Sequence, residues 1–122
     1  MKKISVVALS YGYSMSGAVI GTNKNIDIYK GDILKFSLDR IRGHPFWIKT
    51  KEDTGKQDAV STGISGVGQG KSAGELIWDT TEIEEGTYYY QCEYHANMGG
   101  KIIVHEKTGT TLFKIQMLIL LI

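Results

Sequence analysis

Three side chains that bind soft metal ions lie close together near the C-terminal end of the chain: Cys92, His95 and Met98. They are evenly spaced and lie between two runs of residues typical of β-strands. Zinc sites rarely include a thioether, and magnesium and calcium sites use oxygen ligands. A thiolate, two imidazoles and a long axial thioether are the ligands of a blue-copper electron-transfer site. The sequence therefore predicts a copper site that needs a second histidine.

Two further histidines, His44 and His105, are available for that position. His44 lies far upstream of Cys92, after the clearest strand pattern in the chain. A ligand carried by a distant strand is positioned by the fold before the metal arrives, which favours His44. His105 follows an apolar run that carries no other donor, and we expect it to be a surface histidine.

The size and charge of the chain exclude several classes of protein. Its 122 residues are enough for one domain with a hydrophobic core. The 14 basic and 13 acidic residues give a net charge of +1, without the basic excess of proteins that bind nucleic acid or anionic membranes. Cys92 is the only cysteine, so an internal disulfide is excluded. In a secreted protein such an unpaired cysteine indicates a reactive thiol or a metal ligand.

The composition favours β-strands joined by turns, because the chain has fifteen glycines, seven tyrosines and a single proline. Leu34, Phe36 and Leu38 alternate with polar residues, as in a strand with one buried face. We expect other strands at 4–9, 26–29, 46–50, 75–78, 87–92 and 101–106, and a bent strand or hairpin over 11–20. Residues 51–74 contain six glycines and predict a long loop with one short strand or helical turn. The pattern predicts an all-β, antiparallel β-sandwich.

The two ends of the chain leave alternatives open. Residues 1–10 fit either a short signal peptide or a first strand, and the short apolar run favours the strand. Residues 112–122 are apolar but too few to cross a bilayer, so we expect no transmembrane segment. We therefore expect one domain over residues 1–107 and an apolar tail over 108–122, whose role the sequence does not define.

Over residues 25–106 the sequence resembles the cupredoxins, the family of plastocyanin, amicyanin and pseudoazurin. Cupredoxins have an upstream histidine at the end of one strand and a C-terminal strand–loop–strand that carries Cys-x-x-His and a methionine. Here the loop reads Cys92-x-x-His95-x-x-Met98, and the flanking strands 86–92 and 99–104 also resemble those of plastocyanin. The resemblance implies a Greek-key β-sandwich in which His44, Cys92, His95 and Met98 bind one copper ion that cycles between Cu(I) and Cu(II).

The resemblance also implies a function. The chain is expected to carry single electrons between redox partners that dock transiently near His95, as a monomer, outside the cytoplasm and without enzymatic activity. Two alternatives remain: a module that stores or delivers copper, or a metal-free structural or interaction module. A hydrolase using Cys92 with His95 or His44 is disfavoured, because nothing in the sequence identifies an oriented base or an oxyanion site.

One residue departs from the family pattern. Cupredoxins usually have an asparagine after the upstream histidine, and its backbone N–H reaches the cysteine sulfur. Here that residue is Pro45, which has no N–H to donate. With one hydrogen bond fewer, the thiolate should donate more strongly to the metal. We therefore expect a lower reduction potential than in a relative with asparagine.

Each of these residues also has an ordinary structural explanation. Cys92 and Met98 are types that fill hydrophobic cores, and His44 is able to cap a turn. The tyrosines at 88–90 and the tryptophans at 47 and 78 are expected to pack in the sandwich. Glu93 and Tyr94, which lie between Cys92 and His95, are expected to be solvated loop residues.

Overall fold

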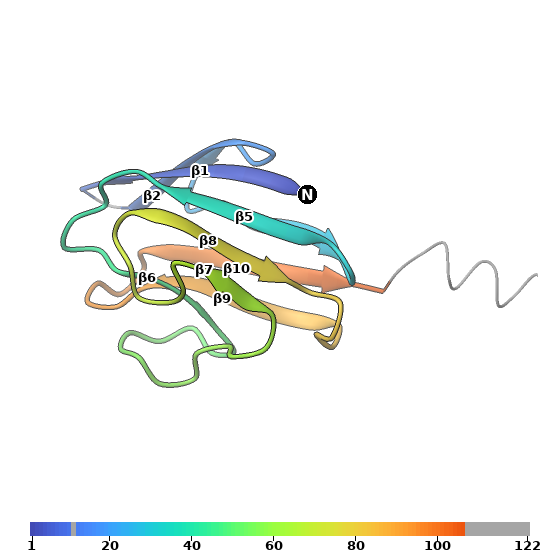
Figure 1. Cartoon of the computed structure of the whole chain (residues 1–122). Helices are drawn as coiled ribbons and strands as arrows, with labels where there is room; N and C mark the ends of the chain where they lie inside the picture. The colour runs from blue at the N-terminus through green and yellow to red at the C-terminus, as the bar shows by residue number, and fades with distance from the viewer. Residues whose placement is uncertain (11, 107–122) are drawn as a thin grey trace, which may run out of the picture.

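The computed structural model describes residues 1–10 and 12–106 (Figure 1). The predicted tail at 108–122, and the boundary at 107, lie outside the described residues. The strands are β1 Lys2–Leu9, β2 Gly12–Gly17, β3 Gly21–Thr22, β4 Ile26–Tyr29, β5 Ile33–Leu38, β6 Phe46–Lys49, β7 Ile64–Gly66, β8 Gly74–Asp79, β9 Gly86–Cys92 and β10 Gly99–His105. Within those ranges no helix has the length and apolarity that crossing a membrane requires.

The strands form two sheets that pack as the two layers of a sandwich, as Figure 1 shows. One sheet has the order β3-β2-β1-β5-β8-β7, and the other has the order β4-β10-β9-β6. The predicted all-β sandwich is confirmed. Two pairs, β1 with β5 and β4 with β10, are parallel, so both sheets are mixed instead of wholly antiparallel. Alternation along a strand defines its buried face but not the direction of its neighbour, which is why the sequence did not indicate these pairs.

The alternating patterns account for the buried faces of the sheets. Leu34, Phe36 and Leu38 of β5 are all buried, and the residues between them are partly exposed. In β1, Ile4 and Val6 are buried in the same way, so residues 2–9 form the strand that the sequence favoured. Fully burying an aliphatic or aromatic side chain contributes about 1.5–3 kcal/mol, so these faces supply much of the stability of the fold.

A cluster of aromatic rings joins the two sheets at the end of the sandwich where His44 and Cys92 lie. The ring of Phe46 in β6 contacts Phe36 in β5, Tyr13 in β2 and Tyr90 in β9, with centroids 5.0, 5.1 and 5.7 Å apart. All four rings are fully buried. Such pairs contribute about 0.5–1.5 kcal/mol beyond the area they bury. The cluster gives this end of the sandwich a rigid base.

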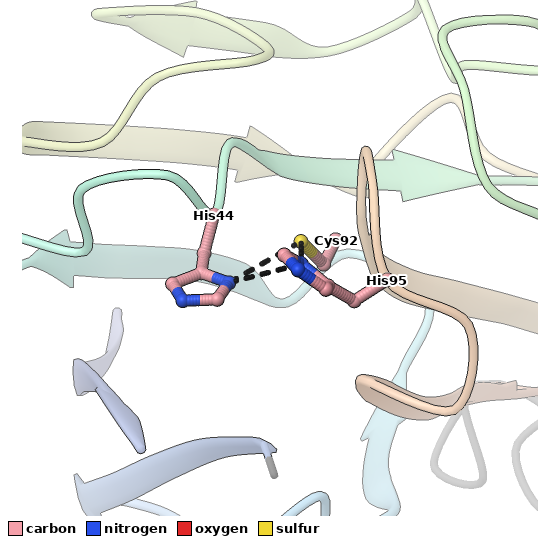
Figure 2. A group of neighbouring side chains, drawn as sticks. All are labelled: His44, Cys92 and His95. Atoms are coloured by element: carbon pink, nitrogen blue, oxygen red, sulfur yellow. Dashed lines mark hydrogen bonds between the residues drawn. The ribbon is translucent and has the colours of Figure 1, made fainter. Parts of the chain in front are cut away.

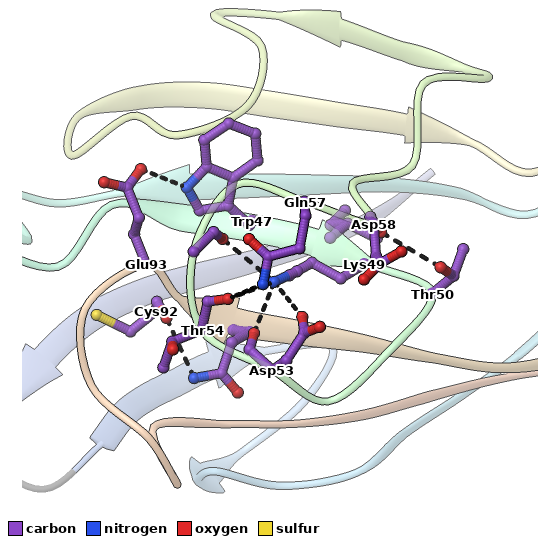
Figure 3. Close-up of polar contacts among 12 residues, drawn as sticks. Trp47, Lys49, Thr50, Asp53, Thr54, Gln57, Asp58, Cys92 and Glu93 are labelled. Atoms are coloured by element: carbon purple, nitrogen blue, oxygen red, sulfur yellow. Dashed lines mark hydrogen bonds and ion pairs between the residues drawn. The ribbon is translucent and has the colours of Figure 1, made fainter.

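The long segment between β6 and β8 is tied to the sandwich. It contains one short strand, β7, which pairs with β8, as the sequence predicted. Lys49 is 0% exposed, and its Nζ donates to the carbonyl oxygens of Asp53, Thr54 and Gly55 at 2.7, 3.1 and 3.2 Å (Figure 3). The same Nζ forms an ion pair with the Asp53 carboxylate. Buried lysines are rare unless paired, so Lys49 is a defined anchor for this loop.

Candidate metal centre

The register of two strands brings the candidate ligands together. In the antiparallel pair β6–β9, Phe46 lies opposite Cys92, the last residue of β9. His44 is two residues before Phe46, so the chain entering β6 passes beside the end of β9. His95 and Met98 follow in the loop between β9 and β10. Ligands from two separate segments therefore meet at one end of the sandwich.

Three ligand atoms form a compact triangle (Figure 2). The Cys92 Sγ lies 3.3 Å from His95 Nδ1 and 3.7 Å from His44 Nδ1, and the two Nδ1 atoms are 3.2 Å apart. Figure 2 shows that both imidazole rings turn a nitrogen toward the sulfur. Among the described residues this is the group of His, Cys and carboxylate side chains that is able to hold a metal ion.

The size of the triangle fits a metal ion. A point equidistant from its three corners lies about 2 Å from each atom, which is the length of a metal–imidazole bond and close to that of a metal–thiolate bond. One sulfur and two imidazole nitrogens in a plane are the equatorial ligands of a blue-copper site. The residues present therefore fit copper in both geometry and ligand chemistry.

Met98 lies in the same loop. Its side chain is buried, and its carbonyl oxygen accepts a hydrogen bond from the Cys92 amide at 2.9 Å. It also borders a surface hollow that His95 lines. These contacts place Met98 beside Cys92 and His95.

The candidate ligands differ in their access to solvent. Cys92 is 0% exposed, His44 is half-buried and His95 is exposed. Burial, followed by the charge of His95, lowers the pKa of His44 below its usual value. The neutral imidazole of His44 is thus favoured, and the neutral form is the one that binds a metal. The thiol is kept away from water while one imidazole reaches the surface.

His105 lies apart from this group, as the sequence predicted. Its Nε2 is 2.8 Å from the Asp27 Oδ1, and its side chain is 46% exposed. Its ring also contacts the ring of Tyr29. It is a surface histidine.

The expectation that Glu93 is a solvated loop residue was wrong. Glu93 is only 8% exposed, and its Oε1 accepts a hydrogen bond from Trp47 Nε1 at 3.0 Å (Figure 3). Its amide donates to the Pro45 carbonyl at 3.0 Å, and its carbonyl accepts from the Gly55 amide at 2.7 Å. A hydrogen bond from Tyr94, followed by that from Trp47, lowers the pKa of the Glu93 carboxyl. Glu93 therefore joins the ligand loop to two other segments, whereas Tyr94 is exposed as expected.

Gln91, in β9 beside Cys92, is a second buried polar residue at the site that the sequence did not reveal. Its Nε2 donates to the His95 carbonyl at 2.8 Å and to the Cys92 carbonyl at 3.1 Å. The side chain thus spans the turn between the two ligands. A glutamine beside the cysteine in a strand is the only signal, and by itself it does not distinguish this role from an outward-facing residue.

The fold and the His–Cys–His triangle define a cupredoxin-like β-sandwich with a candidate copper site at one end. Among solved structures the chain is similar to rusticyanin from Thiobacillus ferrooxidans, with 26% sequence identity, a TM-score of 0.51, and coverage of 84% of this chain and 75% of that chain. A methionine-to-glutamine variant of rusticyanin matches with 22% identity, a TM-score of 0.51, and coverage of 84% and 76%. A Cu(I) structure of an amicyanin variant matches with 20% identity, a TM-score of 0.48, and coverage of 84% and 82%.

The match to rusticyanin confirms the resemblance to the cupredoxins and the predicted fold class. No protein-family model and no curated protein sequence matches the chain. The similarity to known proteins is therefore carried by the structure.

Proposed function

We propose that the chain is a mononuclear type 1 copper protein that carries single electrons between redox partners. The observation that carries the proposal is the triangle formed by His44 Nδ1, Cys92 Sγ and His95 Nδ1. In this proposal these three atoms are the equatorial ligands, and Met98 is the long axial ligand. Bound copper would supply a one-electron Cu(I)/Cu(II) couple. The structural neighbours are cupredoxins, which are electron carriers rather than enzymes.

The surroundings of the site suit electron transfer. Cys92 ends β9, and His95 and Met98 lie in the loop that joins β9 to β10. His44 lies two residues before Phe46 of the aromatic cluster. Both segments are attached to the sandwich, so the ligands are held in place when the charge of the metal changes. Cys92 is fully buried, which keeps water away from the sulfur. When a rigid site has a geometry intermediate between those that Cu(I) and Cu(II) prefer, its ligands move little as one electron is transferred.

Redox partners are proposed to dock around His95. This imidazole is exposed, and Ala96 and Asn97 beside it are exposed as well. Interfaces of electron-transfer proteins are small and exchange rapidly, so a small surface around one exposed ligand is suitable. From the resemblance to the cupredoxins we also propose that the protein works outside the cytoplasm.

The test is to add one equivalent of Cu(II) to the purified metal-free protein and to record a visible spectrum and an EPR spectrum. An intense band near ~600 nm with narrow copper hyperfine splitting is expected from thiolate–copper ligation of the type 1 kind. Reversible cyclic voltammetry would separate an electron carrier from a copper store. Absence of the band in the wild-type protein would contradict the proposal and favour a metal-free interaction module.

A further inference from the structure

The segment that carries His44 is held by a residue from the opposite sheet. Tyr13 in β2 is 0% exposed, and its hydroxyl donates to the His44 carbonyl at 2.7 Å. The Pro45 carbonyl is a second, longer acceptor at 3.3 Å. The side chain of Pro45 has no hydrogen-bonding group with which to hold this segment. Here the hydrogen bond comes from another part of the chain.

The position of the Tyr13 hydroxyl is fixed by its ring. The ring is fully buried and contacts Phe46 and Tyr90, with centroids 5.1 and 6.2 Å away. A phenol hydroxyl in one fixed position is suited to orienting the backbone of His44.

Asn23 performs a similar task for the loop that carries Met98. Its Oδ1 accepts a hydrogen bond from the Gly99 amide at 3.1 Å, and its Nδ2 donates to the Asn97 carbonyl at 3.3 Å. These backbone groups lie on either side of Met98. The side chain of Asn23 also occupies the space above Gly12, where a Cβ would lie 2.5 Å from its Nδ2. A glycine at position 12 therefore lets Asn23 approach the loop.

Tyr13 and Asn23 are joined to each other. The Tyr13 amide donates to Asn23 Oδ1 at 3.0 Å, and the Asn23 amide donates to the Tyr13 carbonyl at 2.9 Å. A continuous set of hydrogen bonds thus runs from the His44 carbonyl through Tyr13 and Asn23 to the backbone on both sides of Met98. It links two segments that each carry a candidate ligand, His44 and Met98, and that lie far apart in the sequence.

We infer that Tyr13 and Asn23 are positioning residues of the metal site, which hold the backbone of His44 and the backbone on both sides of Met98 in place by hydrogen bonds. The inference rests on the proposed copper function for the identity of the metal, but the contacts themselves are made between protein atoms alone. Removing a group that hydrogen-bonds to a metal ligand and orients it typically lowers the affinity for the metal by about 10–100-fold.

The first test compares Tyr13→Phe with Tyr88→Phe. Both substitutions remove one hydroxyl that donates to a backbone carbonyl, His44 for Tyr13 and Glu84 at 2.8 Å for Tyr88. Tyr88 lies in the half of β9 remote from Cys92, so it controls for the general effect of losing such a bond. Titration with Cu(II) against a competing chelator should show a loss of affinity of about tenfold or more for Tyr13→Phe alone. Equal affinities in the two variants would overturn the role of Tyr13.

The second test uses two substitutions of Asn23. This residue has a φ of +50°, which glycine adopts freely, so Asn23→Gly removes the side chain without straining the backbone. Asn23→Asp keeps the acceptor for the Tyr13 and Gly99 amides. Asn23→Gly should weaken Cu(II) binding by about tenfold and shift the reduction potential, and Asn23→Asp should restore most of the affinity. Wild-type affinity and potential in Asn23→Gly would contradict the inference.

A metal-free measurement separates this inference from the proposed function. In the apo-protein, amide hydrogen exchange at Gly99 should accelerate about five- to tenfold in Asn23→Gly, because its acceptor is lost. Exchange at Glu93, whose amide donates to Pro45, should accelerate in Tyr13→Phe and not in Tyr88→Phe. If wild type forms no blue-copper band but these rates change, the proposed function fails and the positioning role stands. If wild type forms the band and no variant differs from its control, the positioning role fails alone.

Discussion

The Cys92 amide donates a hydrogen bond to the Met98 carbonyl oxygen at 2.9 Å, which closes the ligand loop on itself. The loop is closed further by the pairing of Gln91 with Gly99 at the ends of β9 and β10. A side chain at Gly99 would collide with the Tyr90 carbonyl, so the close approach of these strands requires glycine there. Because the bond uses the backbone of Met98, the Met98 side chain is free to change without moving Cys92.

This relationship leads to a prediction about Met98. Met98→Leu should still form the intense copper band, since the three proposed equatorial ligands and the loop closure are retained. Its reduction potential should rise, because a sulfur donor that stabilises Cu(II) is lost and the axial ligand tunes the potential. Visible spectroscopy and cyclic voltammetry measure the two effects.

Cys92→Ser is the matched comparison for that experiment, because it removes the thiolate itself. It should abolish the band completely. If Met98→Leu also loses the band, Met98 is required for copper binding and does not merely tune the potential.

The second prediction concerns Pro45. Pro45→Asn should raise the reduction potential, because it restores a backbone N–H that withdraws electron density from the thiolate. The Pro45 carbonyl already accepts from the Glu93 amide, and that bond does not depend on the side chain. Cyclic voltammetry of the copper-loaded proteins gives the answer.

Pro45→Ala is the control, since it provides the N–H without the amide side chain. If both variants raise the potential equally, the N–H alone is responsible. A potential that stays at the wild-type value in both would show that no hydrogen bond from position 45 reaches the sulfur.

Residue types and spacing were enough to predict much of the fold and the site. Alternation at Leu34, Phe36 and Leu38 defined a buried face, and that face is buried in the structure. His44 was selected over His105 because it lies after a distant strand, and its Nδ1 lies beside the sulfur. Such features are local or depend on rare residue types, so a single sequence displays them.

The supporting residues are less visible in the sequence for a physical reason. Tyr13 and Asn23 bond to backbone atoms of His44, Asn97 and Gly99, and a backbone group leaves no trace in the residue type of the partner. From sequence alone, a tyrosine in a strand is interpreted as a core residue, and an asparagine before a strand is interpreted as part of a turn.

Buried charge was missed for a related reason. Lys49 and Glu93 are types that are usually exposed. Lys49 is buried by the loop that follows it directly, and Glu93 by partners in distant segments of the chain. Only the folded arrangement shows that three carbonyl groups and a carboxylate surround Lys49.

The third prediction tests Lys49. Lys49→Met fills a similar volume but removes the ammonium from the Asp53 carboxylate and from three carbonyl groups, of which only that of Thr54 still accepts from Gln57. Removing one partner of a fully buried pair costs about 3–5 kcal/mol. Because the Asp53 side chain is 34% exposed, we expect a loss of about 2–3 kcal/mol in the free energy of unfolding. Urea denaturation of the metal-free protein measures it.

Lys35→Met provides the control for that loss. Lys35 forms a surface ion pair with Glu75 at 3.0 Å, and surface pairs contribute about 0–1 kcal/mol. Similar free energies of unfolding for the two variants would show that Lys49 is not a special anchor. The loop contact from the Gly55 amide to the Glu93 carbonyl should also weaken in Lys49→Met, which hydrogen exchange at Gly55 reports.

The final prediction is a pH dependence centred on Glu93. The pKa of its carboxyl is lowered by hydrogen bonds from Tyr94 and Trp47, so these bonds stabilise the folded state when the carboxylate is ionised. A carboxyl whose pKa is lower in the folded state than in the unfolded state contributes stability above its unfolded pKa of about 4. That contribution is lost as the pH falls through the lowered value.

Trp47→Phe should therefore destabilise the metal-free protein more at pH 7 than at pH 3. The loss of indole packing is the same at both pH values, so the difference between them isolates the bond to the carboxylate. In NMR titrations the pKa of Glu93 should rise in Trp47→Phe, and it should rise more in Tyr94→Phe, because Tyr94 is the larger cause. The hydroxyl of Tyr88 donates to the Glu84 carbonyl, so Tyr88→Phe should leave the pKa of Glu93 unchanged. Equal destabilisation by Trp47→Phe at the two pH values would mean that the indole stabilises the ligand loop by packing alone.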